Sequence, residues 1–160
     1  MTNINKKSTI QENEYCIELL RKYNIKIKFL MSLGHPGESD KTCEDTYNWL
    51  LKMKPDYFDV SIITTQPGSF YYDNSILTDN GWMYKCPNGD VLYSDDLDYS
   101  VISDFYKGMI GKYTSHVFTD YLTADNLVKW RDYIETNIRS KLNISYPTKK
   151  EISYDKSMGQ

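Results

Sequence analysis

The chain has 160 residues, of which 40% are apolar and 26% charged, a balance that predicts one folded domain with a packed core and excludes wholesale disorder. Its net charge of −3 excludes a basic face for nucleic acid, so we expect no nucleic-acid partner. No apolar run approaches the ~18 residues of a membrane span, and we find no signal peptide.

The cysteines are odd in number and widely spaced, at Cys16, Cys43 and Cys86. This pattern excludes a disulfide-stapled scaffold and a CxxC-type metal site, so we predict no metal ligands in this chain. We expect two packing thiols and one surface thiol, in the reducing environment of the cytoplasm.

A capping box predicts the first helix, over 8–24, because the side chains of Thr9 and Glu12 can each satisfy a free backbone N–H of its first turn. The run over 25–33 alternates at first and is then almost wholly apolar. It predicts a strand whose start is exposed to solvent and whose end is buried on both faces.

Two glycines and a proline interrupt the chain at Gly34–Ser39, and Ser39 can cap a second helix over 40–53. A second strand is predicted over 58–65, after Pro55. A strand, a helix and a strand at this spacing indicate a βαβ unit with parallel pairing.

Turn residues dominate from 70 to 95, where 82–84 and 91–93 predict a short hairpin around Asn88-Gly89. A helix is predicted to follow at 97–107.

The last predicted helix covers 124–142, begins after Thr123 as N-cap, and carries an apolar face. That face consists of Leu127, Trp130, Ile134, Ile138 and Leu142. The tail after Ser145 is predicted to be loosely held.

Only two confident parallel strands are predicted, and both are apolar enough to need neighbours. A two-stranded parallel sheet exposes two edges and is not expected to be stable alone. The sequence therefore predicts a piece of a larger α/β sheet or barrel.

Three segments carry a family resemblance: 29–39, Pro55-Asp56 and 66–69. They resemble the later half of radical S-adenosylmethionine enzymes, in which a GxPGE(T/S) loop ends one barrel strand and a Pro-Gly turn ends the next. Gly34–Ser39 matches the loop closely, and 66–69 keeps Pro-Gly but has Ser in place of Thr. The nearest subgroup is the cobalamin-binding-domain type, similar to anaerobic magnesium-protoporphyrin IX monomethyl ester cyclases, and it extends the resemblance over 122–132 and 157–160.

The family's CxxxCxxC loop, which holds a [4Fe-4S] cluster, has no counterpart, since the cysteines of this chain are 27 and 43 residues apart. The resemblance therefore implies that Met1 is an internal start. An N-terminal barrel half, in the same gene or a separate chain, would be the partner and would hold the cluster. S-adenosylmethionine is the implied cofactor, with cobalamin as an optional second one on a further N-terminal domain.

The implied fold is α/β, a partial (β/α) barrel over 1–69, an irregular hairpin region over 70–120 and a helical extension over 121–160. The resemblance places the adenine and methionine portions of S-adenosylmethionine beside six cofactor-binding residues, Ser32, Gly34, His35, Pro36, Gly37 and Glu38. For Glu38 an equal alternative is a carboxylate that stabilises a helix N-terminus. For His35 the favoured alternative is an ordinary exposed loop residue.

Polar residues on the second strand and after it, at Ser61, Thr65 and Gln66, are the candidates that face a small-molecule substrate. Five aromatic residues can form a floor for a planar substrate, although hairpin packing is the favoured explanation for them: Tyr71, Tyr72, Trp82, Tyr84 and Tyr93.

The resemblance predicts the C-terminal part of a radical S-adenosylmethionine enzyme that supplies part of the cofactor pocket and the substrate-facing wall. Without the cluster it is expected to catalyse nothing alone, so no catalytic residue is assigned. Two alternatives stay open, a stand-alone α/β module that holds a nucleotide-like ligand on the Gly34–Glu38 loop, and one chain of a split enzyme.

Overall fold

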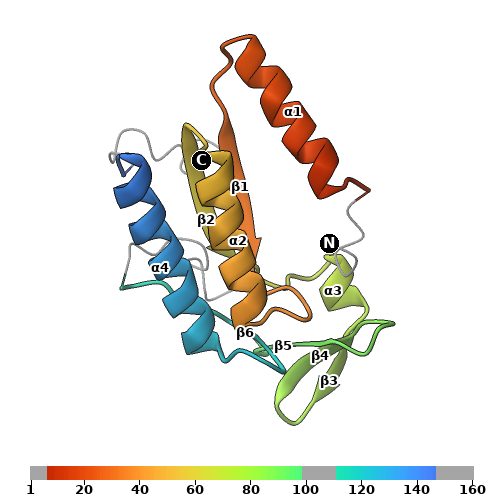
Figure 1. Cartoon of the computed structure of the whole chain (residues 1–160). Coiled ribbons are helices and arrows are strands. Elements are labelled where there is room, and N and C mark those ends of the chain that lie inside the picture. Colours follow the sequence, from red (N-terminus) through yellow and green to blue (C-terminus); the bar gives the residue numbers. More distant parts are fainter. Residues whose placement is uncertain (1–6, 99–110, 147–160) are drawn as a thin grey trace.

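The computed structural model describes residues 7–98 and 111–146 and confirms the α/β class (Figure 1). Within these ranges the strands form two small sheets and no closed barrel. In chain order the elements are α1 (Ile10–Lys22), β1 (Lys28–Leu33), α2 (Asp40–Met53), β2 (Tyr57–Ile62), α3 (Phe70–Asp73), β3 (Ile76–Thr78), β4 (Gly81–Lys85), β5 (Val91–Ser94), β6 (Val117–Thr119) and α4 (Ala124–Leu142).

The long helices begin where the sequence predicts. Thr9 and Glu12 form the capping box of α1, while Ser39 and Thr123 accept hydrogen bonds from the first turns of α2 and α4. These contacts satisfy backbone N–H groups that have no partner within the helix. The helix predicted over 97–107 lies outside the described residues from 99 onward, as does the tail from 147, which includes the matched segment 157–160.

The two sheets differ in direction. Strands β1 and β2 are parallel, as predicted, with Lys28 opposite Tyr57 and Leu33 opposite Ile62. The second sheet is antiparallel in the order β3-β4-β5-β6, and its β4–β5 pair confirms the predicted hairpin. Strands β3 and β6 and the short helix α3 were not predicted.

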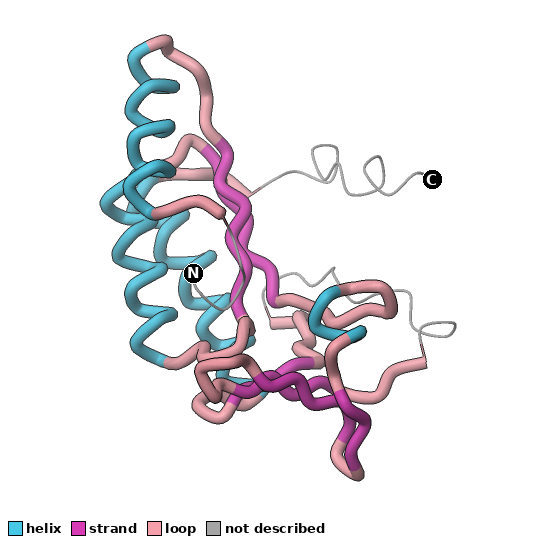
Figure 2. Tube along the Cα trace, turned by 90° about the vertical axis from the view of Figure 1, so that its right-hand side faces the viewer, coloured by secondary structure: helices cyan, strands magenta, loops and turns pink. Residues whose placement is uncertain are grey.

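The core lies on one face of the β1–β2 pair, where α2 and α4 cover it (Figure 2). Phe29 of β1 stacks on Trp49 of α2, and Phe58 and Val60 of β2 are buried. On the opposite face Leu30 is 77% exposed and Ser32 near the strand end is exposed too, so the prediction that the end of β1 is buried on both faces is wrong. The reason is that the described helices pack on one side of these strands only. We call the uncovered side, with Leu30, the open face.

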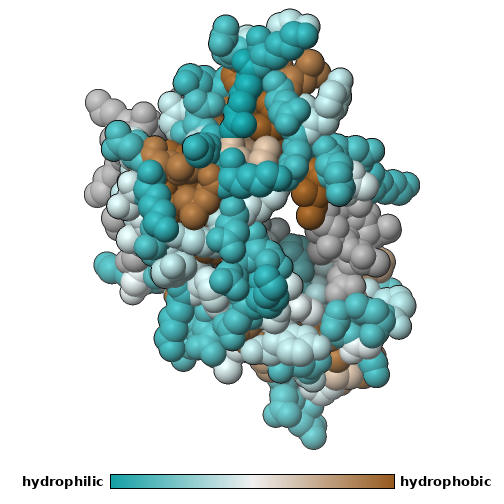
Figure 3. All heavy atoms as spheres, in the orientation of Figure 1, coloured by the Kyte–Doolittle hydropathy of each residue, from teal (hydrophilic) through white to brown (hydrophobic). Residues whose placement is uncertain are grey.

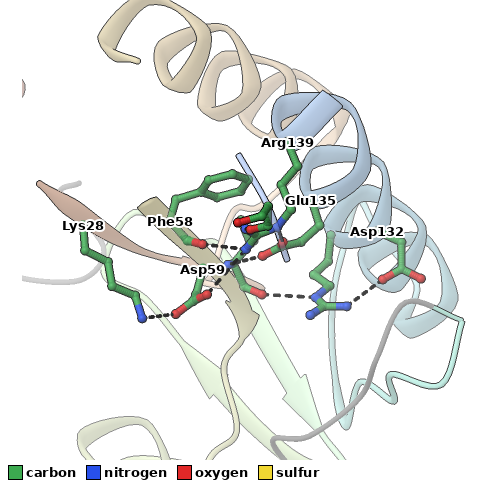
Figure 4. Close-up of polar contacts among 9 residues, drawn as sticks. Lys28, Phe58, Asp59, Asp132, Glu135 and Arg139 are labelled. Carbon is green, nitrogen blue, oxygen red and sulfur yellow. Dashed lines mark hydrogen bonds and ion pairs between the residues drawn. The ribbon is translucent and has the colours of Figure 1, made fainter. Parts of the chain in front are cut away.

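Side chains of α4 close the outer edge of β2 (Figure 4). The Val60 N–H donates to Glu135 Oε1 at 2.8 Å, and Arg131 Nε donates to the Val60 carbonyl at 3.1 Å. Arg139 Nη2 donates to the Phe58 carbonyl at 2.7 Å. These contacts replace those of a neighbouring strand, so β2 forms one end of its sheet.

The groups that close this edge are buried and satisfied. Arg139 Nε donates to Glu135 at 2.6 Å, both side chains are 5% exposed, and the guanidinium lies over the Phe58 ring. Farther along, the Ile62 N–H donates to the Tyr113 hydroxyl at 2.9 Å. A buried ion pair of this kind holds its geometry because each charge has hydrogen-bond partners.

The other edge of the parallel sheet is different, because β1 pairs with β2 and with no further strand in the described ranges. Helix α1, which precedes β1, is attached to α2 by Glu14, which accepts from Trp49 Nε1 and Lys52 Nζ. It still exposes Ile10 and Leu19 to solvent. Figure 3 shows such apolar areas among hydrophilic atoms on the helix side of the molecule.

Replacing Arg139 by leucine is expected to lower the free energy of unfolding by about 3–5 kcal/mol, because Glu135 would remain as an unpaired buried charge. Lys41→Leu is the matched control, since Lys41 pairs with Asp45 at the same helical spacing but in solvent, and its loss should stay below about 0.5 kcal/mol. Urea unfolding measures both, and equal losses would contradict the assigned role of Arg139.

Candidate functional site

The candidate site lies at the carboxyl ends of β1 and β2, where parallel sheets present loops to ligands. The loop 34–38 follows β1, the loop 63–69 follows β2, and helix α3 begins directly afterwards at Phe70. The antiparallel sheet lies beyond these strand ends (Figures 1 and 2). Both sheets therefore contribute to the surroundings of the site.

The loop after β1 needs its glycines. Gly34 and Gly37 have φ angles of 85° and 82°, in the region that favours glycine. A Cβ atom on Gly34 would lie 3.0 Å from Val117 Cγ2 and 3.1 Å from Ile62 Cγ2. The backbone of the loop thus packs closely against both β2 and β6.

Glu38 stabilises this loop from inside. Its carboxylate accepts the Gly34 N–H at 3.1 Å and the Thr42 hydroxyl, and the residue is 9% exposed. Burial raises the pKa of the Glu38 carboxyl, while the Thr42 hydroxyl and the Gly34 N–H act in the opposite direction. The backbone carbonyl of Glu38 accepts the Thr119 hydroxyl of β6 at 2.7 Å. The buried carboxylate therefore stabilises the loop by accepting these hydrogen bonds.

Three polar side chains, of Ser32, His35 and Tyr71, are hydrogen-bonded to one another at this loop. Ser32 Oγ lies 2.8 Å from His35 Nε2, and His35 Nδ1 lies 3.2 Å from the Tyr71 hydroxyl. Ser32 is exposed on the open face, whereas Tyr71 packs against Tyr84 of β4, with ring centroids 5.1 Å apart. Three separate elements thus join in one hydrogen-bonded chain.

The six predicted cofactor-binding residues divide into two groups. Ser32 is exposed and His35 and Gly37 are half-buried, so these can border a ligand. The other three are buried and shape the loop: Gly34, Pro36 and Glu38.

The predicted substrate-facing residues are also only partly accessible. Ser61 lies opposite Ser32 in the parallel register, and its hydroxyl donates to the Met31 carbonyl at 3.4 Å. Thr65 is 3% exposed, and Gln66 is half-buried in the turn after β2. Of these three, Ser61 shares the open face with Ser32.

The aromatic residues pack mainly on one another. The ring of Tyr72 lies against Trp82 at 4.7 Å, and Tyr93 stacks on Phe118 at 4.8 Å. The sequence did not reveal the hydrogen bond between Tyr71 and His35, because α3 is a single short turn without the periodicity that predicts a helix. Sequence reasoning also missed Thr119, whose strand β6 spans three residues, although Val117-Phe118-Thr119 are residue types that favour strands.

The cysteines do not fit an iron–sulfur cluster. Cys16 is exposed on α1 and Cys43 and Cys86 are buried, which confirms the prediction of two packing thiols and one surface thiol. Burial raises the pKa of both the Cys43 and the Cys86 thiol, whereas cluster ligands must be thiolates. Within the described ranges, no three potential metal ligands come together.

A separate cavity of about 350 Å³ lies at the opposite, amino end of the parallel strands. Lys26, Asp56 and Tyr57 line it together with the residues that follow α4. Lys26 and Asp56 form an ion pair there at 2.7 Å, and the Asp56 carboxylate also accepts the Ile27 N–H. This ion pair fastens the start of β1 to the start of β2.

Comparisons with protein-family models, with curated proteins and with solved structures found no match to this chain. Among the described helices, none has the length and apolar content that crossing a membrane requires.

Gly34→Ala is expected to lower the free energy of unfolding by more than Gly68→Ala. Both glycines have positive φ, which costs an alanine about 1–2 kcal/mol. A Cβ on Gly34 would also crowd Val117 and Ile62, adding about 1–3 kcal/mol, whereas Gly68 has nothing within 4 Å. Chemical unfolding of the two variants measures the difference, and equal costs would show that the loop is not packed as described.

Glu38→Gln should change how stability depends on pH. Because the pKa of Glu38 is raised in the folded state, its stabilising contribution is present below pH 4.5 and is lost as pH rises through the folded pKa. Glutamine cannot ionise, so the free energy of unfolding of the variant should increase relative to that of the wild type between pH 4.5 and neutrality.

The control for this comparison is Glu12→Gln, since Thr9 lowers the pKa of Glu12 and the slope should have the opposite sign. Urea unfolding over a series of pH values provides the slopes. A difference between wild type and Glu38→Gln that stays constant with pH would refute the raised pKa.

Proposed function

We propose that this chain forms the later part of a (β/α) barrel of the radical S-adenosylmethionine type, with a wall for the cofactor and for a small-molecule substrate. The observation that carries the proposal is a parallel strand pair that has, among the described residues, one closed edge, one unpaired edge and one open face. The resemblance of 29–39 and 66–69 to the family supports the same reading.

The open face has the composition of a barrel interior near a ligand. Leu30 and Ser32 of β1 and Asp59 and Ser61 of β2 point to this side in matched register. In a complete (β/α) barrel the helices cover the outside and these positions line the inside. Mixed polar and apolar side chains at the carboxyl ends suit contact with a polar small molecule.

The two edges indicate where partners belong. The side chains of Glu135, Arg131 and Arg139 occupy the hydrogen-bonding positions of β2, so β2 suits the last strand of an open barrel. The edge of β1 suits pairing with a preceding parallel strand. The partner is therefore an N-terminal barrel half, in the same gene or in a separate chain.

The cofactor role rests on a small set of groups. The Ser32 hydroxyl and the His35 ring would border S-adenosylmethionine, while Gly34, Pro36 and Glu38 hold the loop that positions them. S-adenosylmethionine, reduced by a cluster on the partner, would supply a 5′-deoxyadenosyl radical. Because the cysteines of this chain do not fit that cluster, the chain is not catalytic alone. Cobalamin would require a further domain, and the free thiols favour a cytoplasmic location.

One observation favours the stand-alone ligand-binding module as a second candidate. Within the described ranges no buried side-chain N or O atom lacks a hydrogen-bond partner, and α4 closes one sheet edge within the chain. A chain with a satisfied interior can fold as a monomer. In that case the Gly34–Glu38 loop would hold its ligand without a partner.

The two candidates differ in their association behaviour. If the barrel is incomplete, the purified chain should self-associate through the β1 edge, and Leu30→Lys should shift it toward monomer because a charge on the open face opposes pairing. Leu77→Lys is the matched control, since Leu77 is also an exposed leucine, on the edge strand β3, and this variant should behave as the wild type.

Sedimentation velocity over a concentration series measures the association of all three proteins. A wild-type chain that is a single monomer and unfolds cooperatively would overturn the incomplete-barrel proposal and favour the module.

A further inference from the structure

A continuous hydrogen-bonded chain runs from the half-buried Tyr71 to the exposed Ser32. Tyr71 Oη lies 3.2 Å from His35 Nδ1, and His35 Nε2 lies 2.8 Å from Ser32 Oγ. The three residues come from α3, the loop 34–38 and β1. Ser32, the last residue of this hydrogen-bonded series, lies on the open face at the carboxyl end of the parallel strands.

The Tyr71 phenol determines which atom donates and which accepts in each of these hydrogen bonds. Burial raises the pKa of Tyr71, so the phenol keeps its proton at neutral pH. In the described part of the protein, the one hydrogen-bond partner of the phenol is His35 Nδ1. The arrangement that gives the phenol proton an acceptor among the described residues has Tyr71 donating and His35 Nδ1 accepting without a proton.

A neutral imidazole with an unprotonated Nδ1 carries its proton on Nε2. His35 Nε2 then donates to Ser32 Oγ, which accepts this bond and keeps its own proton for a further acceptor. In hydrolase triads the polarity is reversed, because Nδ1–H donates to a carboxylate and Nε2 takes the serine proton. His35 is thus unsuited to activate Ser32 as a nucleophile.

We infer that Ser32, His35 and Tyr71 form a donor relay that binds an acceptor oxygen of a ligand, in a carboxylate or a carbonyl group, on the open face. Ser32 is the binding residue, and His35 and Tyr71 are positioning residues that act through it. Each hydrogen bond in the chain polarises the next, so the Ser32 hydroxyl is a stronger donor than an isolated serine. The identity of the ligand as S-adenosylmethionine or its neighbouring substrate rests on the proposed function, whereas the direction of the relay does not.

The direction is tested by ¹⁵N NMR of the histidine rings at a pH of about 8, where imidazole is neutral. The expected spectrum shows His35 protonated on Nε2 alone, and Tyr71→Phe should abolish this preference for one tautomer. Tyr84→Phe is the matched control, because its ring contacts Tyr71 but its hydroxyl has no bond to His35, and it should leave the spectrum unchanged. His35→Gln identifies the signal against that of His116, and His35 protonated on Nδ1 in the wild type would overturn the inference.

Ligand binding is tested by calorimetry with S-adenosylhomocysteine, which has a carboxylate, and with 5′-methylthioadenosine, which lacks it. Ser32→Ala should weaken binding of the first by about tenfold or more, whereas the control Ser140→Ala, at an exposed position on α4, should change it by less than about twofold. Binding of the second ligand should be insensitive to Ser32→Ala. An equal loss for both ligands would place the bound oxygen on the nucleoside and refute a carboxylate or carbonyl partner.

The outcomes separate the two proposals. No binding of S-adenosylhomocysteine by the wild type would count against the proposed function alone, while the histidine tautomer would still decide the relay. A relay confirmed by NMR together with equal affinities of Ser32→Ala and the control Ser140→Ala for S-adenosylhomocysteine would refute Ser32 as the binding residue.

Discussion

The hydrogen bonds from α4 side chains to the backbone of the β2 edge are the constraint on which the rest of this structure depends. A strand edge in a protein interior must find donors and acceptors, and here Glu135, Arg131 and Arg139 provide them. These contacts fix α4 across the sheet, so its apolar residues cover the same face as α2. Among the described residues no strand pairs with the β1 edge, and Leu30 stays exposed on the opposite face, so the two faces of the parallel pair differ.

The loop after β1 connects this segment to the second sheet. The Glu38 carboxylate holds the loop from within, and its carbonyl is bound by Thr119 of β6. On the other side, His35 is bound by Tyr71, whose ring packs on β4. The antiparallel sheet therefore supports the loop and determines which of its side chains are accessible. Of the predicted cofactor residues, Ser32 is exposed and His35 is half-buried.

Sequence patterns predicted the elements that local interactions specify. The caps at Thr9, Ser39 and Thr123 and the turn at Asn88-Gly89 act within a few residues, so their elements were predicted to within a few positions. Strand β6 was missed because three residues carry too little periodicity, and it forms only through pairing with β5. The burial of the end of β1 on both faces was predicted wrongly because a run of apolar residues does not reveal how many layers will cover it.

The amino-acid sequence by itself determined the order of the main helices, the parallel βαβ unit and the glycine-containing loop that ends β1, since each depends on short-range sterics and hydrogen bonds. Only the tertiary structure decided that the Glu38 carboxylate turns inward, that Arg139 ends the sheet, and that Tyr71 lies beside His35. Those contacts join residues that are distant in the chain or depend on which face is covered, and the free energy of burial that selects them exists only once the layers have packed.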